Sequence, residues 1–430
     1  MHYADTLSDR QRLICRRTAV CSTMFGCIST QLIESNALIV LYLTMLGGSD
    51  SFSMFSSSLT SLSNILLLIP CAALAAGWGL RRTYTVSSAV GFLAFGLIAA
   101  APYFGAQAKY AVITGCFIYA LTLTFYASTW YPLLDNFLKP EERGPFFSRM
   151  RFIYILFNAG LLFLLGKFLG SDPPLWLLQG VFLVAGTGLW GRKFCMDRLP
   201  LDPAMQRESP NLKKTLGICL HNQSLVGFSV YLCFMYLAFS GALPLALIYM
   251  KTCLKLADGT IVILTSIHLI GKLAGFWLAG KISKNVSMRI QVIGTHFLAG
   301  LTVLLLLIPV PGMKGSVYLF GLSFFLIGLT AALLLCISSV EMLALATPGN
   351  KIMAIAFCST SISVGTAAGT LLTSLLLGSG ALAPEWYLNG IRLTKFQLLF
   401  GLYAAAVLFF VLLLPLVPAV IRKHDNYYEP

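Results

Sequence analysis

Long apolar segments separated by short polar ones dominate this sequence. Twelve occur, and most reach the roughly 20 residues that a helix needs to cross a bilayer. They occupy residues 18–46, 53–76, 83–104, 110–137, 146–169, 175–190, 225–250, 260–280, 290–308, 317–342, 353–377 and 396–421. Soluble domains carry about a quarter charged residues, whereas this chain has 11% charged and 57% hydrophobic residues. The sequence therefore predicts an all-α membrane protein with twelve transmembrane helices.

A polar, basic and proline-containing stretch at residues 191–223 divides these segments into two groups of six. No other polar stretch in the sequence is as long, which is typical of a linker between two halves. The expected organisation is a cytoplasmic N-terminus (1–17), a six-helix bundle (18–190), a central cytoplasmic linker (191–223), a second six-helix bundle (224–421) and a cytoplasmic tail (422–430).

The two halves resemble each other in short motifs. Gly77 begins Gly-Trp-Gly-Leu-Arg-Arg between the second and third segments, and Gly280 begins Gly-Lys-Ile-Ser-Lys between the eighth and ninth. Asp135 and Glu341 each end a segment and are followed by a proline with a base three residues on. The shared order predicts a parallel duplication. Chance similarity between apolar segments is the alternative.

The charge balance predicts the orientation. The chain has 30 Lys and Arg against 16 Asp and Glu, a formal charge of +14. If the N-terminus is inside, the bases expected on the outer side are few: Lys109, Lys167, Lys251, Lys255, Lys314, Arg392 and Lys395. Cytoplasmic loops of membrane proteins are enriched in Lys and Arg, so both termini are expected in the cytoplasm. The charge then follows from topology with a lipid bilayer as partner, and no nucleic acid is expected.

Signals for a cofactor, a metal site or an enzyme are missing from the sequence. The 11 cysteines show no metal-ligand spacing and are interpreted as small buried hydrophobic residues. Glycine-rich phosphate loops, GxSxG and HExxH are not found. We therefore predict no cofactor, no metal and no enzymatic activity. Short loops and two Asn-X-Ser sequons on the cytoplasmic side favour a bacterial inner (plasma) membrane.

Three motifs carry a resemblance to a known family. They are Tyr42-Leu-Thr-Met-Leu-Gly47, the Gly77-Trp-Gly-Leu-Arg-Arg82 loop and Leu134-Asp-Asn-Phe-Leu-Lys-Pro-Glu-Glu-Arg-Gly144. With them the chain resembles the major facilitator superfamily over essentially its whole length. The resemblance implies a monomer with two pseudo-symmetric six-helix bundles around a central cavity, which rock to expose the cavity to either side. It does not imply a substrate.

The resemblance also implies a cytoplasmic latch, with one departure from the family pattern. In the family, an acid and the bases that follow it in this loop join neighbouring helices. Here Gly77 and Gly280 stand at the acid positions, while the trailing bases remain. Another acid is therefore expected to complete the latch, or the latch is weaker. The latch candidates are Asp135, Glu341, Arg81, Arg82 and Arg143.

Glu34 lies near the middle of the first segment, where an ionisable group is costly and needs a reason. Gln31 is three residues earlier and shares its helix face, so a polar stripe is expected to point into protein or water. A buried carboxyl can load and release a proton, which is the chemistry of proton coupling. Binding of a cationic substrate and a structural ion pair are the alternatives.

Lys272 lies in the middle of the eighth segment, with His268 one turn earlier on the same face. Together they are candidates to hold an anionic group. Alternatively, Lys272 neutralises Glu34 across the two halves or forms a salt bridge that holds one state closed. Both spans approach the central cavity in the family, which makes a pair between Lys272 and Glu34 possible.

Aromatic and polar residues recur at helical spacing in three segments. Tyr119 and Tyr126 share a face of the fourth, Tyr154 and Asn158 are four apart in the fifth, and Tyr231 lies in the seventh. A cavity with aromatic walls and a few polar groups suits an amphipathic solute. Packing or interfacial anchoring is the alternative for each aromatic residue.

The second and eleventh segments are rich in Ser, Thr, Asn and Gly. Small residues let helix backbones approach closely, and in the family these two spans meet across the halves. The pattern predicts a contact that slides and parts, with static packing as the alternative.

These features favour a secondary active transporter of small organic solutes that works by alternating access and is coupled to protons. A membrane-embedded enzyme, a lipid-handling protein and a non-transporting sensor are the alternatives. Substrate identity and direction of transport do not follow from the sequence.

Overall fold

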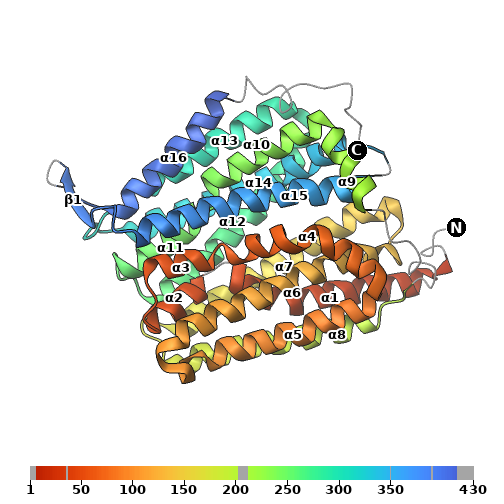
Figure 1. Cartoon of the computed structure of the whole chain (residues 1–430), viewed down its shortest axis with the longest axis horizontal. Coiled ribbons are helices and arrows are strands. Elements are labelled where there is room, and N and C mark those ends of the chain that lie inside the picture. The colour runs from red at the N-terminus through yellow and green to blue at the C-terminus, as the bar shows by residue number, and fades with distance from the viewer. Residues whose placement is uncertain (1–5, 35–36, 202–211, 349, 389–390, 414–430) are drawn as a thin grey trace.

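The structure is a computed structural model that describes residues 6–34, 37–201, 212–348, 350–388 and 391–413. Two bundles of helices lie side by side (Figure 1). The first contains α1 (Asp9–Glu34), α2 (Ala37–Met45), α3 (Asp50–Ser56), α4 (Leu59–Trp78), α5 (Leu80–Ala100), the short 3-10 helix η2 (Ala101–Gln107), α6 (Ala108–Asp135), α7 (Pro140–Leu169) and α8 (Leu175–Asp197).

The short helix α9 (Leu212–His221) precedes the second bundle. This bundle contains α10 (Gln223–Phe239), α11 (Ala242–Thr252), α12 (Asp258–Asn285), α13 (Met288–Leu305), α14 (Ser316–Leu345), α15 (Lys351–Gly378) and α16 (Lys395–Leu413). Strands β1 (Glu385–Leu388) and β2 (Ile391–Thr394) form an antiparallel hairpin between α15 and α16. We call the end of the molecule that carries this hairpin the hairpin end, and the opposite end, where α1 begins and α9 lies, the α9 end (Figure 1).

The first eleven predicted apolar segments each overlap one helix or two helices in series, and the twelfth (396–421) matches α16 as far as Leu413, with its remainder outside the described residues. The first, second and seventh are broken into the pairs α1–α2, α3–α4 and α10–α11. In the α3–α4 break, the hydroxyl of Ser58 donates to the carbonyl of Phe55, a local bond that competes with the helix ladder. In the α10–α11 break, a Cβ at Gly241 would overlap the Tyr403 hydroxyl, so only glycine fits there.

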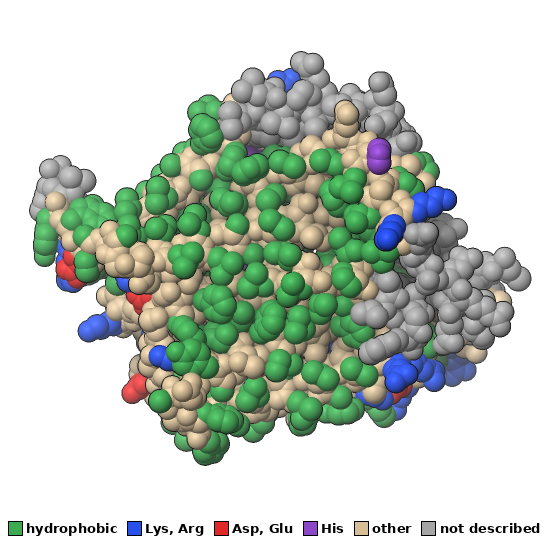
Figure 2. Space-filling model, in the orientation of Figure 1, with side chains coloured by type: hydrophobic (Ala, Val, Ile, Leu, Met, Phe, Trp, Pro, Cys, Tyr) green, Lys and Arg blue, Asp and Glu red, His purple; other side chains and the backbone are tan. Residues whose placement is uncertain are grey.

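The lengths and surface of the helices suit a membrane. Within the described residues, seven helical segments are long and apolar enough to cross a bilayer, or eight if the bent pair α1–α2 counts as one. Figure 2 shows hydrophobic side chains over the middle of one face and Lys and Arg gathered toward the α9 end. Large apolar side chains such as Phe168 and Leu375 are about 70% and 68% exposed, which is ordinary only in lipid. The chain is an integral multi-pass membrane protein, and the full count of twelve crossings stays a prediction.

The structure differs from the predicted boundaries at several places. Helix α1 begins at Asp9, inside the stretch predicted as an N-terminal segment (1–17), and α7 begins at Pro140, six residues before the predicted start at Phe146. Helix α8 runs to Asp197, so the sixth helix continues seven residues past the predicted end at Trp190 and takes Arg192 and Lys193 with it. The hairpin β1–β2 was not predicted. Its strands flank Asn-Gly in the sequence, a dipeptide typical of two-residue hairpin turns.

The two bundles meet along three sets of helices. Helix α7 packs along α12, α3 and α4 pack on α15, and α2 contacts α11 and α12. The contact of α3 and α4 with α15 confirms that the second and eleventh predicted segments meet across the halves. The elements that position the candidate site are therefore α1, α6, α7 and α8 of the first bundle, with α12 as the neighbour across the interface.

Candidate functional site

A cavity of about 390 Å³ lies inside the first bundle, in the half nearer the α9 end. Its volume lies in the range of small-molecule sites. Four helices supply the walls: α1, α6, α7 and α8. The lining residues are Thr23, Gly26, Cys27, Thr30, Gln31, Leu123, Tyr126, Ala127, Trp130, Phe147, Met150, Arg151, Tyr154, Asn158 and Arg192.

Arg192 reaches the cavity from α8 and is 3% exposed. Its guanidinium carbon lies 3.7 Å from the centre of the Tyr126 ring. The side chain passes Gly26 of α1, where a Cβ would come within 2.5 Å of the Arg192 Cδ, so the path requires glycine. The Nε atom is buried and has no hydrogen-bond partner. Arg192 is therefore a buried cation held by stacking, and no carboxylate among the described residues pairs with it.

Arg151 enters the same cavity from α7. Its guanidinium lies 5.8 Å from the ring of Phe276 on α12, so it stands at the border between the two bundles. The described lining thus contains two arginines and no Asp or Glu. The electrostatic potential of the cavity is expected to be positive.

Polar groups from α1 and α7 complete the lining. Asn158 is 2% exposed, and its Oδ1 atom has no hydrogen-bond partner. Thr30 shares a hydrogen bond of 3.1 Å with the hydroxyl of Tyr119, which is fully buried behind the wall. Gln31 also lines the cavity. A buried acceptor without a donor is costly and is available to a bound molecule.

The structure brings some of the predicted site residues together. Gln31, Tyr126, Tyr154 and Asn158 line one cavity, and Tyr119 supports it from behind. Trp130, which was not predicted as a site residue, also lines it. Glu34 is the last residue of α1, one turn beyond Gln31, and its side chain lies outside the described part of the chain.

The candidates of the second bundle lie elsewhere. His268 is buried, and its Nδ1 lies 3.3 Å from the carbonyl oxygen of Phe324 on α14. Tyr231 shares a hydrogen bond of 2.8 Å with Nε2 of His296 on α13. Lys272 is half-buried on α12, one turn after His268. None of the three belongs to the described lining of the cavity.

The latch candidates are spread along the α9 end. Arg81 and Arg82 are exposed in the first turn of α5. Glu341 of α14 is 5% exposed, and its Oε2 atom has no hydrogen-bond partner. The side chains of Asp135 and Arg143 lie outside the described residues, so the predicted latch stays a prediction.

An acid that the sequence analysis assigned to the linker lies close to one of these bases. Asp197, at the end of α8, accepts hydrogen bonds from the Tyr84 hydroxyl (2.8 Å) and from Nζ of Lys193 (2.6 Å). Partial burial favours its neutral form, but the Lys193 and Tyr84 hydrogen bonds and the charge of Arg81 outweigh this and hold the pKa of Asp197 below its usual value. Asp197 therefore joins the start of α5 to the end of α8, at the α9 end of the molecule.

A second cluster ties α1 to α7. Glu142 pairs with Arg12 and Arg16 of α1 and accepts a hydrogen bond from the backbone N–H of Lys139. Partial burial favours the neutral form, but the hydrogen bond from Arg16 and the neighbouring charges outweigh it and lower the pKa of Glu142. The cluster fixes two of the helices that line the cavity.

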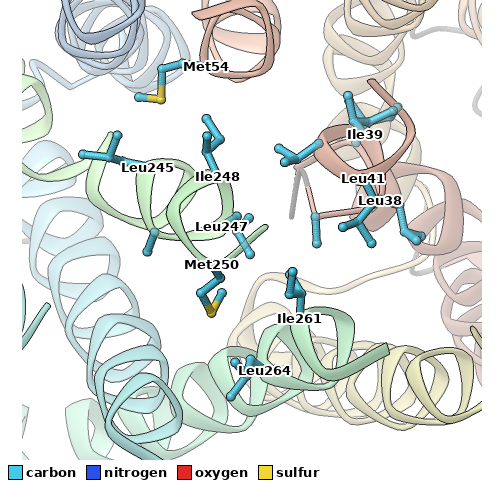
Figure 3. Close-up of a cluster of buried hydrophobic side chains, with 14 of the residues drawn as sticks. Leu38, Ile39, Leu41, Met54, Leu245, Leu247, Ile248, Met250, Ile261 and Leu264 are labelled. Atoms are coloured by element: carbon cyan, nitrogen blue, oxygen red, sulfur yellow. The ribbon is translucent and has the colours of Figure 1, made fainter. Parts of the chain in front are cut away.

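An apolar plug closes the molecule between the cavity and the hairpin end. Figure 3 shows Leu38 and Leu41 on α2, Leu247 on α11 and Ile261 on α12, three helices that contact one another here. All four are 0% exposed and belong to one core cluster that spans both bundles. These four side chains are therefore closed off from solvent where the two bundles meet.

Polar contacts between the bundles lie beyond the plug. The hydroxyl of Ser51 donates to the carbonyl of Ser374 (2.8 Å), and Ser374 Oγ donates to the carbonyl of Ser51 (2.8 Å). Lys395 pairs with Asp50 at 3.2 Å.

The ends of α7 and α12 meet in the same region. The backbone N–H of Gly259, in the first turn of α12, donates to the carbonyl of Gly170 at the end of α7, with an N–O distance of 2.6 Å. This bond satisfies an orphan donor of one helix with an acceptor at the end of another. The bonds between Ser51 and Ser374, the pair of Lys395 with Asp50 and the bond from Gly259 to Gly170 all join the two bundles at the hairpin end.

Comparison with solved structures identifies the fold. A mutant of the nucleoside transporter NupG matches with a TM-score of 0.72 and 11% identity, covering 94% of this chain and 98% of its own. A POT family transporter in complex with 5-aminolevulinic acid matches with a TM-score of 0.70 and 13% identity over 96% and 97% of the two chains. A D-xylose–proton symporter gives 0.69 and 12% over 97% and 98%. The chain has the fold of the major facilitator superfamily. No protein-family model and no curated protein matches the sequence.

Arg192 and Asp197 were not predicted as functional candidates from the sequence. Both were assigned to the basic linker, because a cluster of positive charge after an apolar run normally marks the end of a span. The apolar residues that continue between the charges, such as Phe194 and Cys195, were the available signal. At helical spacing they extend α8 and place Arg192 on the face that packs against α1.

Proposed function

We propose that this protein is a secondary active transporter that moves small organic solutes across a membrane by alternating access. The observation that supports this most directly is asymmetric closure. The plug and the polar contacts close the hairpin end, while the cavity lies in the other half of the molecule. Solved structures of the same fold are described as transporters. Rocking of the bundles would break the contacts at the hairpin end and expose the cavity there.

The interface between the second and eleventh segments supports such a movement. Ser51 and Ser374 bond through hydroxyls and carbonyls without bulky interlocking side chains. Hydrogen bonds of this kind contribute about 1 kcal/mol net, because water replaces them when they break. We infer that the contact is made and broken in each transport cycle.

We infer that protons drive the transport. Glu34 is the first candidate carrier, because it lies on α1 one turn from Gln31 in the cavity wall. Glu341 is a second, because it is buried with an unpartnered oxygen. A buried carboxylate without a counter-ion is costly, which favours proton uptake. The proposed pair of Glu34 with Lys272 is testable by E34Q and K272A alone and together. Recovery in the double variant would support pairing.

The membrane and the orientation form part of the same proposal. We place the α9 end in the cytoplasm, because Lys and Arg gather there (Figure 2). The bacterial inner membrane and a monomeric state complete the proposal.

Flux into proteoliposomes tests the function. Purified protein would be assayed with labelled sugars, carboxylates, nucleosides and peptides, with and without an imposed pH gradient. We expect at least one solute to accumulate only with the gradient, and E34Q or E341Q to abolish that dependence while the solute still exchanges. Matched variants at exposed acids, such as Asp172→Asn, serve as controls. A broad panel with no protein-dependent flux would refute the proposal.

A further inference from the structure

The described lining of the cavity in the first bundle carries positive charge and no acid. Arg192 is 3% exposed, stacks on Tyr126 and leaves Nε without a hydrogen-bond partner. Arg151 adds a second guanidinium to the same lining. Buried charges in proteins are normally paired, since desolvation of a lone cation is expensive. Among the described residues, neither arginine has an acid as partner.

The position of Arg192 is also built into the surrounding helices. Gly26 of α1 leaves the space through which the side chain passes, and any Cβ there would meet the Arg192 Cδ at 2.5 Å. The ring of Tyr126 supports the face of the guanidinium. Stacking holds the guanidinium plane but leaves its in-plane N–H donors available, which is the geometry that a carboxylate or phosphate accepts through two parallel hydrogen bonds.

The remaining lining complements an organic body rather than a bare ion. Trp130, Phe147 and Tyr154 supply aromatic walls. Asn158 is 2% exposed and presents an acceptor, Oδ1, that no donor among the described residues satisfies. A hydroxyl or amine on the bound molecule would satisfy it. An inorganic anion would leave both the apolar walls and this acceptor unused.

We infer that the cavity binds an organic anion whose carboxylate or phosphate is held by Arg192 and Arg151 and whose hydroxyl or amine donates to Asn158. This names the substrate class and rests on the proposed transport function. Arg151 also contacts Phe276 of the other bundle, so an anion held there lies at the border that moves when the bundles rock. Lys in place of Arg192 would keep the charge but lose the two-point geometry.

Paired ligands that differ only in charge test the inference. Purified wild-type protein in detergent would be titrated with 4-hydroxybenzoate and 4-hydroxybenzamide, succinate and succinamide, and glucose 6-phosphate and glucose. Thermal shift and calorimetry report binding. We expect at least one acid to bind while its neutral partner does not. Comparison of the two carboxylic acids with glucose 6-phosphate shows whether a carboxylate or a phosphate binds more tightly.

Variants locate the site. Arg192→Gln is expected to weaken binding of that acid by about tenfold or more, because charge-assisted hydrogen bonds are lost, and Arg192→Lys by less. Arg198→Gln is the matched control on the same helix, since Arg198 stacks on the exposed Phe194 at 4.0 Å, away from the lining. Arg149→Gln is the matched control for Arg151→Gln, because Arg149 lies two residues before Arg151 and is exposed.

The melting temperature of the ligand-free protein distinguishes loss of binding from misfolding. If Arg192 awaits a ligand, Arg192→Met relieves a buried unpaired charge, and the ligand-free protein should melt at the same temperature or higher. A lower melting temperature together with unchanged anion binding would mean that Arg192 only packs, and would overturn the inference. So would equal binding of acids and amides, or no binding of any acid.

Two further outcomes separate this inference from related ones. Stabilisation by phosphatidylglycerol nanodiscs but by no soluble acid would assign the arginines to a lipid headgroup and overturn the solute assignment. Gradient-driven flux of a neutral solute without anion binding would keep the transport proposal and reject this inference. Anion binding without any flux would keep this inference and reject the transport proposal.

Discussion

The two bundles approach closely at Gly166, Gly170 and Gly259, and this contact offers a way to open the hairpin end by a single methyl group. A Cβ at Gly259 would lie 2.6 Å from the Gly170 carbonyl oxygen and closer still to that of Gly166. Ordinary contacts begin at 3.4 Å, so the helix ends must separate by about 0.8 Å or more. Gly259→Ala is therefore a wedge between the bundles in the closed state alone.

The size of the effect follows from the bond that the wedge breaks. Separation removes the hydrogen bond from the Gly259 N–H to the Gly170 carbonyl. Its net contribution of about 1 kcal/mol corresponds to about a fivefold change in the ratio of open to closed molecules. The helix propensity gain of Ala over Gly acts on both states and cancels. Steric overlap adds to the shift, so fivefold is the expected minimum.

Thiol labelling measures this shift without knowledge of the substrate. Met54→Cys places a reporter at a fully buried position of α3 that faces α11 (Figure 3), in a background with Cys21 and Cys253 replaced by Ser. An impermeant maleimide added on the hairpin side should label it at least about fivefold faster with Gly259→Ala. Gly160→Ala is the matched control, since its Cβ would meet nothing within 4 Å. Equal labelling rates with Gly259→Ala and with Gly160→Ala would refute the claim that these contacts hold the hairpin end closed.

Three further predictions concern the α9 end. The pKa of Glu142 is depressed in the folded protein, so its stabilising effect is present at neutral pH and is lost as the pH falls through the folded pKa. Glu142→Gln should therefore weaken the dependence of the melting temperature on pH between pH 6 and pH 3. An unchanged dependence would contradict the pairing with Arg16. Tyr84→Phe removes the hydrogen bond to Asp197 and should cost about 1 kcal/mol or less, because water reaches that partly exposed carboxylate; a cost well above this in a denaturant titration would contradict the assignment. Glu341→Gln should leave the melting temperature at pH 7 unchanged or higher, since Oε2 of this buried carboxyl has no hydrogen-bond partner among the described residues; a marked decrease would reveal a counter-ion.

The sequence was sufficient for the fold because lipid imposes a simple rule. In a bilayer each backbone polar group must be satisfied within a helix, so long apolar runs predict helices directly, and each predicted segment overlaps a helix among the described residues. The breaks were missed, because Ser58 and Gly241 act through local hydrogen bonds and close contacts that hydropathy does not register. Tertiary context decides those positions.

The site was predicted only in part, for a related reason. Gln31, Tyr126, Tyr154 and Asn158 were found because periodicity shows which residues share a helix face. Arg192 was missed because a charge after an apolar run is ordinarily a topology signal. Its burial depends on the small Gly26 of a helix more than 150 residues away, which no local pattern encodes.

A reversible crosslink across the hairpin end tests the central claim most directly. The hydroxyls of Ser51 and Ser374 are 3.2 Å apart, so cysteines at both positions are close enough to bridge when the bundles are closed. In proteoliposomes, the solute with the largest gradient-driven flux would be followed before oxidation, after oxidation and after reduction, with each single cysteine as control. Alternating access predicts that oxidation abolishes flux only in the double variant and that reduction restores it. Undiminished flux through the crosslinked protein would contradict the account.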